Sequence, residues 1–137
     1  MSFRPLPAQV RALLGTTVGS HEQLAILLHL HRDPTLKLTA RELGSRLRIT
    51  ESLVETALAE LCTAGLLERD GSGTPTRYAY RASEELGMAV AALDREYDAN
   101  PVEVIRFMTT SAIERLRTSA LKAFADAFIL TRKRDDG

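Results

Sequence analysis

Residues 38–81, LTARELGSRLRITESLVETALAELCTAGLLERDGSGTPTRYAYR, decide the fold of this chain. Thr39 and Glu42 have the spacing of a capping box, in which each side chain hydrogen-bonds the backbone N–H of the other residue. Such residues mark the start of a helix because they satisfy N–H groups that have no partner inside it. A short helix is therefore expected over residues 40–47.

A second helix is expected over about 50–65. Thr50 is predicted as its N-cap, and Gly65 as the left-handed residue that ends it. Between these ends, apolar residues recur at spacings of three and four, which is the pattern of one buried helix face: Val54, Ala57, Leu58 and Leu61. Because only residues 47–49 separate the two helices, the helices must cross sharply, as they do in a helix-turn-helix.

A wing is expected after the second helix. Segments 66–69 and 77–80 are short strand candidates, and residues 70–75 between them consist of turn-forming Asp, Gly, Ser, Thr and Pro. The predicted fold class is mainly α: a winged helix-turn-helix with a three-helix core, a two-stranded β wing and additional C-terminal helices.

The helix that completes the core is expected over residues 20–32, where Ser20 and Gln23 again have capping-box spacing. It is apolar on most sides, so we expect it at the centre of the molecule. An earlier short helix is expected over residues 7–14, with a proline at its first position and Gly15 after its end.

Residues 20–82 resemble the winged helix-turn-helix of bacterial transcription regulators of the broad MarR-like kind. The resemblance rests on the L-T-A-x-E-L start of the motif, the Ile-Thr cap, the V-x-x-A-L-x-x-L stripe and the A-G-L-L-x-R entry to the wing. It implies a transcription regulator whose partner is double-stranded DNA. The second motif helix, about 50–65, would then enter the major groove, and the wing, about 66–81, would contact phosphate or the minor groove.

Two groups of side chains are the predicted DNA contacts. Arginines that flank the turn or lie on the wing are placed to clamp phosphates. Exposed residues near the start of the second motif helix are placed to reach base edges. The predicted set is Arg41, Arg46, Arg48, Thr50, Glu51, Ser52, Glu55, Thr56, Arg69 and Arg77.

An alternative is a winged-helix module that binds a protein instead of DNA. The chain carries 18 basic and 18 acidic residues, whereas a DNA-binding domain usually has a basic excess. The second motif helix has no Arg, Lys, Asn or Gln, and Leu53 stands where a polar residue is expected. Arg48 stands where regulators usually carry the turn glycine. The acidic, partly apolar face around Leu53 and Glu55 would then contact the protein partner.

Two further helices are expected after the wing. One runs from a cap at Ser83 to about Asp98, and the next begins at the strong start signal Asn100-Pro101. A break is expected near residues 109–110, where a new capping box is available, followed by an amphipathic stretch to about residue 130.

The C-terminal helices, residues 83–131, are expected to join two copies of the chain. Regulators of this type are generally symmetric dimers that match two DNA half-sites. The whole chain, residues 1–137, is expected to form a single domain, with residues 20–82 as its winged-helix core. The residues predicted at the homodimer interface are Leu116, Leu121, Phe124 and Phe128.

Nothing in the sequence favours an enzyme, a cofactor or a metal. His29 and His31 are two residues apart on a helix and point to different faces, so they are a poor metal pair. The glycines at 71 and 73 lie in a hairpin rather than between a strand and a helix, unlike a phosphate-binding loop. The single cysteine, Cys62, fits a reducing compartment. With no membrane span and no signal peptide in view, a cytoplasmic protein is expected.

Overall fold

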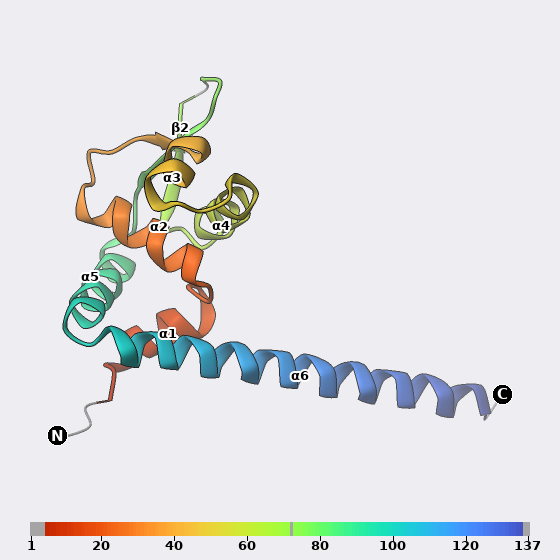
Figure 1. The fold of residues 1–137 in the computed structure, drawn as a ribbon. Coiled ribbons are helices and arrows are strands. Elements are labelled where there is room, and N and C mark those ends of the chain that lie inside the picture. Colours follow the sequence, from red (N-terminus) through yellow and green to blue (C-terminus); the bar gives the residue numbers. More distant parts are fainter. Residues whose placement is uncertain (1–4, 72, 136–137) are drawn as a thin grey trace.

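Six helices and a small sheet make up residues 5–71 and 73–135, the part of the chain that this computed structural model describes. Figure 1 shows that α1 to α5 and the sheet form one body, while α6 lies against one side of it and continues far beyond it. The predicted winged-helix fold is confirmed. The elements are α1 (Ala8–Thr16), α2 (His21–Arg32), β1 (Leu38–Thr39), α3 (Ala40–Leu47), α4 (Glu51–Thr63), β2 (Leu67–Asp70), β3 (Arg77–Tyr80), α5 (Glu84–Ala99) and α6 (Pro101–Asp135).

The sheet has three antiparallel strands in the order β1-β3-β2, so the prediction of a two-stranded sheet was incomplete. In β3, Tyr78 pairs with Leu38 of β1 on one side and with Arg69 of β2 on the other. β1 is only two residues long. A strand this short has no recognisable alternation in sequence, and it exists because β3 offers it an edge.

The helix-turn-helix forms as predicted. Thr39 Oγ1 accepts from the N–H of Glu42 at 3.1 Å, and Glu42 Oε1 accepts from the N–H of Thr39 at 3.1 Å. Gly44 allows the helices to cross closely, because a Cβ there would lie 2.8 Å from the carbonyl oxygen of Ile49. Arg48 adopts the left-handed conformation with φ 57°. The turn is therefore the usual one, and the protein accepts about 1 kcal/mol of strain by placing a non-glycine residue there.

The predicted C-terminal end of α4 is confirmed, but the predicted cap at its N-terminal end is not. Gly65 has φ 81°, and the N–H of Leu66 bonds the carbonyl of Leu61 at 3.0 Å, which confirms the left-handed ending. Thr50 occupies the N-cap position, but its side chain accepts no capping hydrogen bond. The predicted threonine cap was therefore wrong in its chemistry, although right in its place.

Two other predicted helix boundaries were wrong. α1 continues through Gly15 to Thr16, because the packing of the buried Leu13 and Leu14 outweighs the low helix propensity of one glycine. α6 has no break near residues 109–110. The hydroxyl of Thr109 donates to the carbonyl of Ile105 at 3.0 Å within the helix, a bond that lets threonine remain in a helix interior.

α5 is held to α2 by one acidic residue. Asp94 accepts a hydrogen bond from Arg32 at 2.8 Å and lies 3.0 Å from Nδ1 of His31, whose ring contacts Tyr80 edge-on. Burial alone would raise the pKa of Asp94, but its hydrogen bonds to Arg32 and His31 together outweigh burial and hold that pKa below its ordinary value. The contact adds a polar link to the apolar packing of α5, in which Val90 and Leu93 are fully buried.

α2 is the centre of the core, as its composition predicts, and it carries one buried amide. Gln23 is 3% exposed. Its Oε1 accepts from the N–H groups of Gly19 at 2.7 Å and Ser20 at 3.0 Å, while its Nε2 donates to the carboxylate of Glu60 on α4. One side chain thus caps α2 and attaches that helix to the second motif helix.

Replacing Gln23 with Ala should lower the free energy of unfolding by about 1–3 kcal/mol, because it leaves two N–H groups and a carboxylate without their partner. Chemical denaturation followed by circular dichroism measures this change. The matched control is Gln9→Ala on the exposed face of α1, which should stay within about 0.5 kcal/mol of the parent. Equal effects of the two substitutions would show that the buried amide does not hold the helices together.

Candidate nucleic-acid interface

α4 has one buried face and one face open to solvent. Val54, Leu58 and Leu61 are fully buried, and α4 packs mainly on α2 and α3. The 3.6-residue period of the helix then turns the intervening residues outward. The exposed set contains every residue predicted to read DNA from this helix or its cap: Thr50, Glu51, Ser52, Glu55 and Thr56.

A groove lies between the start of α3, the exposed face of α4 and the wing. It brings together four of the predicted contact residues, which are far apart in sequence: Arg41, Glu51, Glu55 and Arg69. Two arginines and two carboxylates therefore share one concave surface. The remaining lining residues are Thr39, Ala40, Ala59, Pro75, Thr76 and Tyr78.

Tyr78 is a groove residue that sequence reasoning missed. The guanidinium of Arg69 lies 5.9 Å from the centre of the Tyr78 ring, over its face. This contact is favourable and holds the arginine in the groove. The sequence shows a hairpin, in which residues directly opposite each other on the two strands lie side by side. To know that Tyr78 lies opposite Arg69 requires the register of the hairpin, which only the structure gives.

The other wing arginine is already engaged by the protein. Arg77 donates to the carbonyl of Lys37 at 3.2 Å and lies 3.8 Å from Oε1 of Glu42. Lys37 in turn lies 3.5 Å from the carboxylate of Asp70. All of these side chains are partly or largely exposed, so the pairs are weak and Arg77 is not fixed in place.

The arginines near the turn lie apart from the groove. Arg48 is exposed at the left-handed position between α3 and α4. Arg46 is also exposed and lies near His29 of α2. The pKa of His29 is lowered mainly by burial, and further by the positive charges of Arg46 and Arg32. Among the residues that the structure describes, the side chains of Arg46 and Arg48 have no partner in a hydrogen bond or an ion pair.

The tip of α4 combines polar, acidic and apolar side chains. The hydroxyl of Thr56 donates to the carbonyl of Ser52 at 3.1 Å, which leaves its oxygen free to accept. Leu53 is 50% exposed beside these polar residues. The surface can therefore offer hydroxyls and carboxylates to base edges, arginines to phosphates, and one apolar side chain to a methyl group or to a protein.

The residues predicted at the dimer interface all lie on α6: Leu116 lies beside Gly19 and His21 of the body, and the other three lie farther along the helix. Their exposed fractions are 72% for Leu116, 63% for Leu121, 74% for Phe124 and 62% for Phe128. Among the described residues, no helix is long and apolar enough to cross a membrane. The same residues contain no group of three or more side chains that could hold a metal ion.

Comparison with known proteins gives a family. The family model described as MarR family matches residues 8–77, slightly more than half of the chain. This segment runs from α1 through both motif helices to the start of β3. No curated protein sequence matches the chain.

Solved structures agree. HlyU from Vibrio cholerae has 26% sequence identity and a TM-score of 0.51, over 64% of this chain and 88% of that one. HlyU from Vibrio vulnificus, described as a transcriptional regulator, has 27% identity and a TM-score of 0.50, over 63% of this chain and 85% of that one. A MarR family transcription regulator, SP03579, has 22% identity and a TM-score of 0.53, over 88% of this chain and 81% of that one.

The last of these is too distant in sequence to show more than the fold, but it extends the structural likeness into the C-terminal helices. The family match includes the motif whose exposed helix and groove are described above. The chain therefore belongs to the MarR family of winged-helix, DNA-binding transcription regulators.

Proposed function

We propose that this protein regulates transcription as a homodimer that inserts α4 into the major groove of DNA and sets the wing against the phosphates. The observation that carries the proposal is the groove in which Arg41 and Arg69 flank the exposed face of α4. Neither arginine forms an ion pair with another residue in residues 5–71 and 73–135. Two unpaired arginines on either side of a reading helix suit the two phosphate strands that border a groove.

The start of α4 offers a further phosphate contact. Because the side chain of Thr50 does not cap the helix, the first N–H groups of α4 have no side-chain acceptor there. Such N–H groups, together with the positive end of the helix dipole, attract a phosphate oxygen. The N–H groups that the side chain of Thr50 does not cap can therefore donate to a phosphate oxygen of the DNA backbone.

The two carboxylates beside the arginines oppose binding to DNA in general. Glu51 and Glu55 repel phosphates, so they lower the affinity for any DNA sequence that does not offer them a hydrogen-bond donor. A glutamate can accept a hydrogen bond from the amino group of a cytosine. We therefore infer that these residues favour selective binding over tight non-specific binding, with the hydroxyls of Ser52 and Thr56 as further readers.

A second candidate function is protein recognition by the same face. The observation in its favour is Leu53, which is half exposed between two acids and has no polar group to offer a base. A partner with a basic, apolar surface would suit it. This candidate predicts no binding to DNA even at low salt, whereas the first predicts binding that weakens as salt rises.

Replacing Arg41 and Arg69 together with Ala should weaken binding to duplex DNA and lower the slope of log Kd against log salt concentration by about 2 per chain, since each lost phosphate contact contributes about 1. Fluorescence anisotropy with a labelled mixed-sequence duplex, repeated at several salt concentrations, measures both quantities.

The control for this pair is Arg11→Ala with Arg95→Ala, which removes two exposed arginines from α1 and α5 and leaves the net charge change the same. The control should bind DNA with the parental slope. If both double variants weaken binding equally, net charge rather than the groove determines the affinity.

Replacing Glu51 and Glu55 together with Gln should have the opposite effect and tighten binding to mixed-sequence DNA by roughly threefold to tenfold at low salt, because it removes two charges that repel phosphates. The gain should shrink as salt rises. Glu84→Gln with Glu85→Gln at the start of α5 is the matched control. An unchanged affinity in the α4 variant would mean that this face of the helix does not approach DNA.

A further inference from the structure

α6 has two apolar faces, and the described residues of the chain cover only one of them. Val104 and Met108 are buried against the body of the protein. A neighbouring face of the helix is exposed from Val102, at 62%, to Phe128, also at 62%, and its first half borders Gly19 and His21 of the body. Figure 1 shows that the helix keeps its course well past the last contact with the body. Because most of the stability of helices in proteins comes from packing of an apolar face, we expect this exposed face to pack against another surface.

Five apolar residues and one threonine form a line along the helix, which we call the α6 stripe. It consists of Ile105, Thr109, Ile113, Leu116, Ala120 and Phe124. Their spacings are four, four, three, four and four residues, so the series is the same read in either direction. Val102 and Phe128 extend the stripe by one turn at each end.

We propose that two copies of the chain associate by antiparallel pairing of their α6 stripes, about a two-fold axis that passes between Glu114 and Arg115. The proposal deepens the dimer named under the proposed function and rests on it. A two-fold interface must be complementary to itself. In this register every stripe residue meets a stripe residue of the other copy: Ile105 meets Phe124, Thr109 meets Ala120, and Ile113 meets Leu116.

The sizes of these side chains fit the register. The two small residues, Thr109 and Ala120, meet each other, so the helices can approach closely between contacts of large side chains. The hydroxyl of Thr109 donates to Ile105 within its own helix, and so it brings no unpaired donor into the interface. The large pairs lie at the centre and at the two ends.

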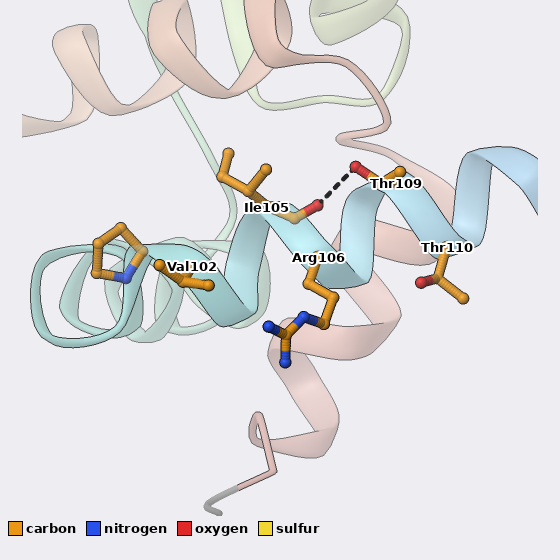
Figure 2. A pocket seen from close by; sticks show the side chains of 6 residues that line it. Val102, Ile105, Arg106, Thr109 and Thr110 are labelled. Carbon is orange, nitrogen blue, oxygen red and sulfur yellow. Dashed lines mark hydrogen bonds between the residues drawn. The ribbon is translucent and has the colours of Figure 1, made fainter.

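A shallow depression lies at the end of the stripe near the body. Figure 2 shows Val102, Ile105, Arg106, Thr109 and Thr110 around this mostly apolar hollow on α6. In the proposed register, Phe124 and Phe128 of the second copy come level with it. The aromatic rings that are most exposed in one chain would thus be buried against the other.

Charge favours the antiparallel direction. Arg117 borders the stripe, and Glu114, three residues earlier, lies behind it on the same side. An antiparallel pair sets the same side of the two helices face to face, so Glu114 of each chain comes near Arg117 of the other. A parallel pair would set this side against the opposite one, where the uncharged Ala112 and Ser119 offer no such attraction.

The exposed area is large enough for a stable pair. Seven large apolar residues of the stripe and its edges are each 38–74% exposed: Val102, Ile105, Ile113, Leu116, Leu121, Phe124 and Phe128. Their exposed surface is on the order of 800 Å² per chain, which is the upper limit of the apolar area that pairing can bury and is close to the contribution of one partner to a standard stable interface. A monomer rarely leaves a continuous apolar surface of this size in water.

Cysteine cross-linking tests the register. In a Cys62→Ser background, Thr109→Cys and Ala120→Cys are prepared as separate full-length proteins of different tag length, and each is oxidised alone and as a mixture. The proposal predicts a disulfide-linked heterodimer in the mixture. It predicts no linked homodimer of either variant, because residue 109 of one chain and residue 109 of the other are about 16 Å apart along the helix axis, as are the two residues 120.

The outcomes separate the arrangements. A parallel pair would link each variant to itself, and α6 packed on the body of the other copy would link neither variant nor the mixture; either result overturns the proposal. Ser111→Cys mixed with Thr118→Cys is the matched control, because the register brings these positions level but on faces turned away, and it should not cross-link. Ile105→Cys with Phe124→Cys repeats the test if the first pair disturbs folding.

The result is independent of DNA binding. Cross-linking as predicted in a protein that does not bind DNA would retain the register and overturn the proposed function. DNA binding by a protein that fails to cross-link would do the reverse.

Discussion

The architecture depends on the buried amide of Gln23. It completes the cap of α2 through Gly19 and Ser20 and reaches Glu60 on the second motif helix. Gly19 itself is covered by α6, since a Cβ at that position would lie 2.6 Å from a guanidinium nitrogen of Arg115. The central helix and the reading helix therefore meet through one short polar connection, and the side chain of Arg115 on α6 lies against its capping residue Gly19. Because a buried amide without partners is costly, the central helix and the reading helix cannot easily shift independently of each other.

The charge pattern explains how a chain with no net charge can belong to a DNA-binding family. The positions of the positive side chains matter here more than their number. Arg41 and Arg69 are held at the edges of the groove, while Arg77 and Arg81 are partly neutralised by Glu42 and Glu68. Glu51 and Glu55 line the same groove, and we expect them to lower the affinity for phosphates alone. We therefore expect such a head to depend on a favourable sequence, and on a second copy that doubles the contacts, more than a strongly basic head does.

Most of the fold could be predicted from the sequence because it is encoded locally. The capping residues Thr39 and Glu42, the stripe of α4 and Gly65 each specify a feature through neighbours within a few residues. What could not be predicted depended on partners distant in sequence: β1 needs the edge of β3, and Gly15 stays helical because of packing around α1. The continuity of α6 was missed because Thr109 and Ser111 suit a cap as well as a helix interior. In the candidate site, the identities of Arg41 and Arg69 were predictable, but their meeting in one groove with Tyr78 required the hairpin register.

The central claim is that the exposed face of α4 and the wing form a surface for DNA. Its most direct test is the affinity of the unaltered protein for a mixed-sequence duplex, measured by fluorescence anisotropy at about 50 and about 200 mM salt. We expect binding that weakens about tenfold or more between the two conditions, because the two groove arginines alone replace at least two counterions. Absence of binding at the lower salt concentration, or binding that does not depend on salt, would contradict it and would favour a protein as the partner of this face.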